Sequence, residues 1–595
     1  MKHKNQLLAF TITLLILFVS PETQISRCAA GEKRERKFFA HYMGCFPVGR
    51  GASQYHRREA KRFGGELRQY NLVPFDANLS RLESADLELR RAARIGLDGF
   101  AIDTWAGGIE AKNTLDALFW VAEKKDYPVE ITICIDASCL SMSPKPGTVD
   151  AVRYLLDVHG DSLKLARRDG KVLVFGYQSI WPGVQHLWDV LGPKIGWDKR
   201  GKIAAAVGRM RRTPEGWRHI AGGYRWIEKQ VGQPIYWHFG MGAFFHGVSR
   251  KKNQSLSTRK AAGVIAEKLD AVGQFTWGGN VKGMAEAVLA EGKEFSVPML
   301  LQYENKMMGR SYGGPGTKAI RGKWSFARNL PSTLIQYTTW NDYNENTILA
   351  PGLKLRYAYF DFTGEMIRWW KTGEPPTSDH DKIYIFSRDY PHKARVYPGS
   401  SMGCAKGALE IMTILPQPAT VRLKGRGEDG EDVTWEAPSG MHARQFPVTP
   451  GPVIVELLRD GKVAKRLEHP DPITDKPCTF NGGINAYSTE FYRHWKADFG
   501  DTDPEPILQS LYGDEDDDGL PNWFEMRWFG TVGDWSTITK ARPKADPDRD
   551  GKTNIEEYRQ QSDPTVGPVS TNPDDFEKGS DEGDETMNLL DELAE

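Results

Sequence analysis

Between Lys37 and Gly373, short apolar runs rich in β-branched and aromatic residues alternate with segments whose apolar residues recur every three or four positions. The first pattern is typical of buried strands and the second of amphipathic helices. The predicted helices include Ala85–Arg94, Asn113–Lys125, Arg259–Asp270 and Val281–Ala290. The eight predicted strands are Phe38–Met43, Gly99–Trp105, Glu130–Asp136, Val172–Tyr177, Ile235–Phe239, Gly273–Trp277, Val297–Tyr303 and Thr333–Trp340. This α/β pattern predicts a (β/α)8 TIM barrel over residues 37–375. A doubly wound open sheet is the alternative, although no glycine-rich phosphate loop follows the first strand.

The pattern changes after Pro375, where short strands are separated by Gly, Pro and Asp turns. These strands predict a β-sandwich domain over residues 376–470, followed by a loosely structured connector over 471–510. A small acidic module occupies residues 511–565. Residues 571–595 hold ten acids and one lysine, so we expect 566–595 to be a disordered acidic tail.

The N-terminus resembles an export signal. Lys2 and Lys4 precede an apolar run from Leu7 to Val19, and Ala30 ends a small-residue cleavage site. We therefore expect residues 1–30 to be a signal peptide and the mature chain to be secreted, periplasmic or at the cell surface. An uncleaved anchor is the alternative, and no later segment is apolar enough to cross a bilayer. The net charge is zero and no basic block is dense enough to predict nucleic-acid binding.

Chemistry in a barrel of this class lies at the carboxyl ends of its strands. In this chain the predicted strand ends carry acids, imidazoles and aromatic rings. The predicted substrate-binding residues are His41, Tyr42, Asp103, Trp105, Asp136, His238, Trp277, Tyr303, Trp340 and Tyr343. A metal site in the barrel is a weaker alternative, because the first strand has no His-x-His pair.

Asp342 and Glu345 follow the eighth predicted strand, three residues apart and beside aromatic residues. Paired carboxyl groups next to aromatic rings are what acid/base cleavage of a glycosidic bond requires. The structural alternative is a helix N-cap, in which Asn341 or Asp342 opens a helix and Glu345 completes a capping box. Their position at the end of the last barrel strand favours catalysis.

Three segments, Lys37–Gly44, Gly96–Asp103 and Thr339–Glu345, resemble the signature segments of glycoside hydrolase family 71, the endo-1,3-α-glucanases or mutanases. The resemblance covers roughly residues 37–375. It implies a (β/α)8 barrel with a β-sandwich behind it, and inverting hydrolysis of α-1,3-glucan in which Asp342 and Glu345 are essential. We expect a polysaccharide substrate and no cofactor for catalysis.

Two positions depart from the family pattern: Asn344 stands where Gly is usual, and Asp103 where Asn is usual. The endo-α-mannanases, which have a similar Trp-Asn-Glu-x-x-Glu segment, are the nearest alternative. A non-catalytic carbohydrate-binding surface protein on a decayed barrel is another. An inverting glycosidase needs one carboxylic acid at the leaving oxygen and one carboxylate that activates water, about 6.5–9.5 Å apart. We assign Glu345 as the general acid and Asp342 as the general base.

The acidic module contains two loops with the spacing of EF-hand-like calcium sites. Each loop offers three aspartates, one backbone carbonyl and a glutamate, which is an oxygen set that Ca²⁺ prefers. The first set is Asp514, Asp516, Asp518, Leu520 and Glu525, and the second is Asp546, Asp548, Asp550, Lys552 and Glu557. The tandem resembles thrombospondin type 3 or dockerin-like repeats. We expect structural Ca²⁺, and a cell-surface or protein partner that binds through this module.

Overall fold

The computed structural model describes residues 34–44, 79–104, 109–136, 147–177, 182–186, 213–242, 257–275, 277, 280–305, 310–313, 316–342, 345–388, 408–474, 484–508, 513–514, 516–522, 524–525, 542–560 and 564. The predicted signal peptide and acidic tail lie outside these residues. The chain divides into two units, Met1–Arg36 and Lys37–Glu595, and every element below belongs to the second. Within the described part of the chain, no helix has the length and apolarity needed to cross a membrane.

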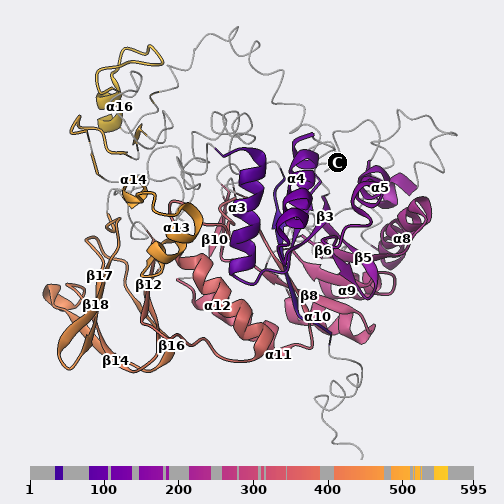
Figure 1. Cartoon of the computed structure of the whole chain (residues 1–595), viewed down its shortest axis with the longest axis horizontal. Coiled ribbons are helices and arrows are strands. Elements are labelled where there is room, and N and C mark those ends of the chain that lie inside the picture. The colour runs from indigo at the N-terminus through magenta and orange to yellow at the C-terminus, as the bar shows by residue number, and fades with distance from the viewer. Residues whose placement is uncertain are drawn as a thin grey trace, which may run out of the picture. The chain divides into compact units, whose positions relative to one another are not determined.

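Eight parallel strands form a closed barrel, which confirms the predicted (β/α)8 architecture (Figure 1). Neighbouring strands pair in chain order, and the last strand pairs with the first to close the ring. The strands are β1 (Lys37–Tyr42), β2 (Gly99–Asp103), β3 (Glu130–Asp136), β5 (Lys171–Tyr177), β6 (Ile235–Met241), β7 (Ala271–Gln274), β8 (Glu294–Met299) and β11 (Leu334–Tyr337). A short strand, β4 (Arg167–Arg168), pairs with β5 in antiparallel fashion.

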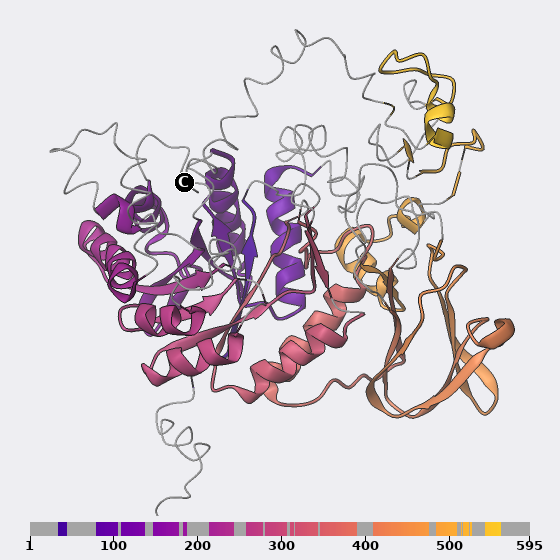
Figure 2. The ribbon, with the colours of Figure 1, turned by 180° about the vertical axis from the view of Figure 1, so that it is seen from behind.

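Helices connect the strands and cover the outside of the barrel (Figures 1 and 2). They are α3 (Arg81–Arg94), α4 (Ile109–Lys125), α5 (Thr148–His159), α8 (Pro214–Val231), α9 (Thr258–Ala266), α10 (Val281–Ala290), α11 (Lys318–Asn329) and α12 (Ala358–Thr372). Helix α3 starts four residues earlier than its apolar pattern predicts. Ser80 and Glu83 form a capping box there, which satisfies backbone N–H groups at the helix start.

Alternation along the strands decides which side chains enter the barrel. On β1, Phe38, Ala40 and Tyr42 belong to the core between strands and helices, whereas Phe39 belongs to the barrel interior. Because successive side chains in a strand point to opposite faces, His41 points inward like Phe39. Gly99 leaves the space that the Phe39 ring occupies, since a Cβ at Gly99 would lie 2.3 Å from that ring.

Strand β8 of the barrel begins and ends earlier than predicted. β8 starts at Glu294, before the predicted start at Val297, because Glu294 is buried in an ion pair with Arg168 inside the amino-terminal end of the barrel. It ends at Met299. Tyr303 therefore lies on a separate antiparallel ribbon formed by β9 (Gln302–Asn305) and β10 (Arg310–Gly313).

Beyond the barrel, two four-stranded antiparallel sheets follow (Figure 2, orange). The first has the order β16-β13-β12-β19 and the second β15-β14-β17-β18. Apolar side chains of both sheets belong to one continuous cluster. The strands are β12 (Lys382–Arg388), β13 (Leu409–Leu415), β14 (Ala419–Leu423), β15 (Val433–Ala437), β16 (Gly440–Phe446), β17 (Ile454–Arg459), β18 (Lys462–Glu468) and β19 (Ile484–Ser488). A 3-10 turn, η8 (Glu428–Gly430), precedes β15.

The segment 471–510, expected to be a loosely structured connector, contains β19, α13 (Phe491–Phe499) and α14 (Glu505–Leu508). This corrects the expectation. β19 pairs with β12, a strand one hundred residues away in the chain, so its stability comes from a long-range partner that local sequence does not reveal. Further along, α16 (Asn554–Gln560) follows the second acidic loop.

Candidate active site

Three barrel strands carry predicted site residues that point into the carboxyl end of the barrel. His41 is the second-last residue of β1, and Asp103 and Asp136 are the last residues of β2 and β3. All three are buried. The imidazole Nε2 of His41 lies 3.6 Å from Oδ2 of Asp103. Two residues outside the predicted set join them: the Phe275 ring lies 4.9 Å from the His41 ring and 3.9 Å from the Tyr177 ring. The structure thus brings these strand-end residues into one cluster.

Asp342 and Glu345 lie on the loop that follows β11, beside this cluster. The Asp342 side chain accepts a hydrogen bond from the Glu345 backbone N–H at 3.3 Å, and the Tyr303 hydroxyl donates to Glu345 Oε1 at 3.2 Å. Asp342 is almost fully buried, whereas Glu345 is half-buried. The bond to the Glu345 N–H is half of a capping box, but the first helix in the described residues after this loop is α12, which begins at Ala358. Asp342 therefore caps a turn and does not open a helix.

The loop is tied to the end of β1 by its neighbours in sequence. The Asn341 side chain accepts from the Met43 N–H at 2.7 Å and donates to the Met43 carbonyl at 3.2 Å. The backbone N–H of Trp340 donates to the His41 carbonyl at 2.7 Å, and the Asp342 N–H donates to Thr339 Oγ1 at 2.8 Å. These bonds consequently hold the backbone of Asp342 next to the end of β1, which carries His41.

Burial dominates the electrostatics of the cluster. It raises the pKa of Asp342 well above its ordinary value, and the nearby carboxyl groups of Glu345, Asp103 and Asp136 raise it further. Burial also raises the pKa of Asp103 to about 7, against a smaller lowering effect of Asp136. The pKa of His41 falls to about 4, because the loss of solvation outweighs the attraction of Asp136 and Glu345. At neutral pH the cluster therefore contains a neutral imidazole, and Asp103 and Asp342 hold their protons to higher pH than exposed carboxyl groups do.

Other predicted substrate-binding residues lie away from this cluster. Tyr42 and Trp340 are fully buried in the core outside the barrel wall, where both rings pack edge-on against Phe100 at 5.1 and 5.0 Å. The Trp340 indole N–H donates to the buried Glu88. Their burial in this core contradicts a role in stacking on a sugar. Tyr42 points outward because it follows the inward-pointing His41 on β1.

His238 and Trp277 also lie away from the cluster, in two different places. His238 points into the barrel interior, fully buried against the Phe175 ring at 4.6 Å, and burial lowers its pKa to about 3. Trp277 is half-buried and packs edge-on against Phe326 of α11 at 5.3 Å, beyond the end of β7. Trp105 and Tyr343 lie outside the described residues.

Sequence reasoning missed three residues that shape the site: Phe275, Asn341 and Thr339. The sequence predicts Phe275 within the strand Gly273–Trp277, but the side to which its ring points depends on pairing with strands far away in the chain. For Asn341 the sequence suggests only a helix cap. Asn341 lies next to the proposed acids in sequence, and its side chain can both donate and accept hydrogen bonds. That combination is the sequence feature that could indicate a residue holding the loop in place.

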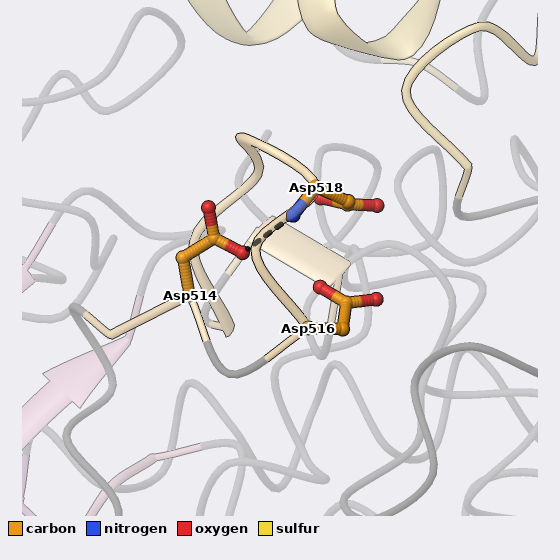
Figure 3. Close-up of side chains that lie close together, drawn as sticks. All are labelled: Asp514, Asp516 and Asp518. Atoms are coloured by element: carbon orange, nitrogen blue, oxygen red, sulfur yellow. Dashed lines mark hydrogen bonds between the residues drawn. The ribbon is translucent and has the colours of Figure 1, made fainter.

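The two acidic loops have the same local geometry. In the first loop, the side chain of Asp514 accepts from the N–H group of Asp518 at 3.0 Å (Figure 3) and from that of Gly519 at 2.8 Å. In the second, Asp546 accepts from Asp550 at 3.2 Å and Gly551 at 3.0 Å. In each loop one oxygen from each of three aspartates lies within 4.8 Å of the others. The glutamates predicted to complete the sites, Glu525 and Glu557, are each 1% exposed.

A comparison with protein families bears on this geometry. Residues 284–498 match the sequence model of glycosyl hydrolase family 71. The matched segment begins in α10, includes β8, β11 and the Asp342–Glu345 loop, and ends in α13. The chain is a glycoside hydrolase.

Solved structures of other glycosidases are similar at low sequence identity. The GH99 endo-alpha-mannosidase from Bacteroides thetaiotaomicron is 15% identical, with 51% of this chain and 85% of that chain covered and a TM-score of 0.37. Its complex with BIS-TRIS-Propane gives 13% identity, 56% and 97% coverage and a TM-score of 0.37. A glycosyl hydrolase family 2 member from Bacteroides cellulosilyticus is 8% identical, with 73% and 46% covered and a TM-score of 0.35. No curated protein matches the chain by sequence.

Proposed function

We propose that this glycoside hydrolase cleaves an α-linked polysaccharide, with α-1,3-glucan as the substrate, by an inverting acid/base mechanism. The observation that carries the proposal is the pair of residues Asp342 and Glu345 after the last barrel strand, joined by the hydrogen bond from the Glu345 N–H to the Asp342 side chain. Further polar groups face the pair: His41 and Asp136, together with the Tyr303 hydroxyl that holds Glu345. Paired carboxyl groups with further polar side chains around them are what cleavage of a glycosidic bond requires.

The two carboxyl groups titrate as a pair. Burial and then the charge of Glu345 raise the pKa of Asp342 well above its ordinary value, which favours one proton on the pair near neutral pH. The pair therefore holds one proton. The raised pKa of Asp342 favours this proton on Asp342 when no substrate is bound. We nevertheless assign its delivery to the leaving oxygen to Glu345, because Glu345 is the more exposed member. Asp342 is then the carboxylate that removes a proton from the attacking water.

Isosteric amides test these roles. Glu345→Gln should reduce release of reducing sugar from α-1,3-glucan by about 10²–10⁴-fold, the usual contribution of a general acid. It should keep most of its activity on a glycosyl fluoride, because fluoride leaves without protonation. Asp342→Asn should lose activity on both substrates, since neither can react without an activated water. Glu267→Gln, an exposed residue paired with Arg218, is the matched control and should behave as wild type.

The same assay decides the substrate. A panel of α-1,3-glucan, α-mannan and β-glucans should show release from α-1,3-glucan alone. Release from α-mannan would replace this proposal with an endo-α-mannanase-like activity, which the resemblance of the Trp340–Glu345 segment to that family makes the second candidate. Binding without release from any member, or wild-type activity of Glu345→Gln, would refute a catalytic role and favour a non-catalytic carbohydrate-binding protein.

We also propose that the two acidic loops bind structural Ca²⁺. The aspartate cages, the buried glutamates and the left-handed glycines Gly519 and Gly551 support this. Such loops offer carboxylate and backbone oxygens, the ligands of a hard cation. Calorimetry on the whole protein should find two sites, with one lost in Glu525→Gln and the other in Glu557→Gln. Glu556→Gln, an exposed neighbour that bonds Thr553, should keep both. Absence of heat at millimolar Ca²⁺ would refute the sites.

The remaining organisation follows from the sequence. We propose that the two antiparallel sheets pack as a β-sandwich and that the calcium loops form an EF-hand-like attachment module for a surface or protein partner. We infer export from the signal peptide at residues 1–30, which predicts a mature N-terminus at Gly31. Amino-terminal sequencing of the protein recovered from its producing cells tests this.

A further inference from the structure

Asp103 is a fully buried carboxyl group in an unusual setting. Its exposed fraction is 0%. The groups beside its oxygens are the Asp136 carboxyl, whose hydrogen bonding lowers the pKa of Asp103 less than burial raises it, and the His41 Nε2 at 3.6 Å. No ion pair joins Asp103 to a lysine or arginine in the described part of the chain. A buried carboxylate whose neighbours are another acid and a neutral imidazole is costly, so this position favours the protonated form.

The groups that face Asp103 are acids or neutral side chains. β1 contributes His41, and β3 contributes Asp136 and the buried thiol of Cys134, whose pKa is raised by burial and by both aspartates. The loop after β11 contributes Asp342, whose pKa Asp103 raises. A change in the charge of Asp103 is therefore felt directly by the proposed catalytic pair, in a site where water does not screen it.

We propose that Asp103 is a positioning residue of the glycosidase site. It does not contact the sugar; its own protonation state sets how strongly the Asp342–Glu345 pair retains a proton. This rests on the proposed function, and it replaces the substrate-binding role expected for Asp103 from sequence. When Asp103 is neutral, the pair loses its proton at lower pH. When Asp103 ionises, its negative charge opposes ionisation of the pair and keeps the acid form to higher pH. Asparagine at this position has the same shape but removes that control.

The decisive variant is Asp103→Asn in the full-length protein, compared with wild type over a range of pH. The alkaline limb of the kcat/KM profile on α-1,3-glucan should move to lower pH by about one unit, the size of effect that one nearby like charge produces. Asp136→Asn should move it in the same direction, because Asp136 also raises the pKa of Asp342. Asp150→Asn, an exposed acid on α5, is the control and should leave the limb unchanged. A lower rate with an unmoved limb would overturn the proposal.

A second readout does not depend on activity. Burial raises the pKa of Asp103 from 3.8 to about 7. Between these two pH values the folded protein therefore holds a proton that the unfolded chain releases. The stability of the wild type therefore falls, relative to Asp103→Asn, as pH rises from about 4 to about 7, and the difference is constant above that. If the Tm difference between the wild type and Asp103→Asn does not change with pH, Asp103 does not hold a proton in the folded protein and the proposal is wrong. If the wild type cleaves no glycan, the proposed function and the catalytic link both fail, while the Tm series still decides whether Asp103 holds a proton.

Discussion

At the scale of single residues, Asn341 ties the loop that carries the proposed acids to the end of β1 through two hydrogen bonds to Met43. Replacing it with alanine removes both hydrogen bonds to Met43 and leaves the Met43 N–H and carbonyl buried. We expect Asn341→Ala to lower stability by about 1–3 kcal/mol and kcat by about 10–10²-fold, because small displacements of catalytic groups are costly. Asn280→Ala removes the N-cap of α10 and is the control: it should lower stability by about 1 kcal/mol without changing kcat. Equal kcat values for the two variants would contradict this.

His238 makes the barrel interior sensitive to acid. Its pKa is lowered from 6.5 to about 3 by burial, so between these values the unfolded chain takes up a proton that the folded protein refuses. Stability is therefore full above about pH 6.5 and falls as pH drops toward about 3, by an amount on the order of 4 kcal/mol for a fully buried group. His238→Gln cannot titrate, so its unfolding free energy should depend less steeply on pH in that window. Denaturant unfolding at several pH values measures the two slopes, and parallel slopes would contradict the prediction.

The site illustrates what sequence alone can supply at this scale. The rule that chemistry lies at the carboxyl ends of barrel strands led to His41, Asp103 and Asp136, which the structure does bring together. It could not separate His41 from Tyr42, because a strand's inward face follows from pairing with distant strands. The same ambiguity placed Trp340 at a sugar-binding surface, although it is part of the core.

At the scale of elements, helices α3 and α13 are joined by a buried ionic cluster. Asp498 of α13 accepts hydrogen bonds from Arg91, Arg94 and the Tyr357 hydroxyl, and these partners lower its pKa despite burial. Helix α3 in turn carries Glu88, which holds the indole of Trp340 beside the proposed catalytic loop. An element that follows the antiparallel sheets thus supports the barrel mouth through α3.

This cluster gives a prediction about the element junction. Asp498→Ala leaves the fully buried Arg91 without its carboxylate, and we expect a loss of about 3–5 kcal/mol in the free energy of unfolding. Because the pKa of Asp498 is lowered, its contribution is complete above the unfolded pKa and is lost as pH falls through the lower folded value. Asp150→Ala, which removes an exposed pair with Arg153, should cost less than about 1 kcal/mol. Similar losses for the two variants in urea unfolding would contradict the role of α13.

At the scale of the whole molecule, periodicity was enough to predict a closed barrel, because eight β/α repeats leave few other arrangements. It was not enough to show how the barrel joins the antiparallel sheets. The junction consists of contacts between residues far apart in sequence: Arg356 binds Asp471 at 3.0 Å, and Thr317 and Arg321 bind the buried Glu410. Buried charges of this kind have no local signature, so the boundary predicted at residue 376 rests on composition alone.

These contacts predict that the barrel does not fold stably by itself. A fragment of residues 37–375 would keep Arg91 and Arg356, each buried in the whole protein, but lose their partners Asp498 and Asp471. Each uncompensated charge costs several kcal/mol, which is comparable to the total stability of about 5–15 kcal/mol of a typical domain. A fragment of residues 37–508 keeps every one of these pairs. We therefore expect 37–508 to unfold in a single cooperative transition in calorimetry, and 37–375 to be insoluble or to lack a transition. A folded 37–375 fragment with the Tm of the longer one would show that the barrel is independent of the sheets.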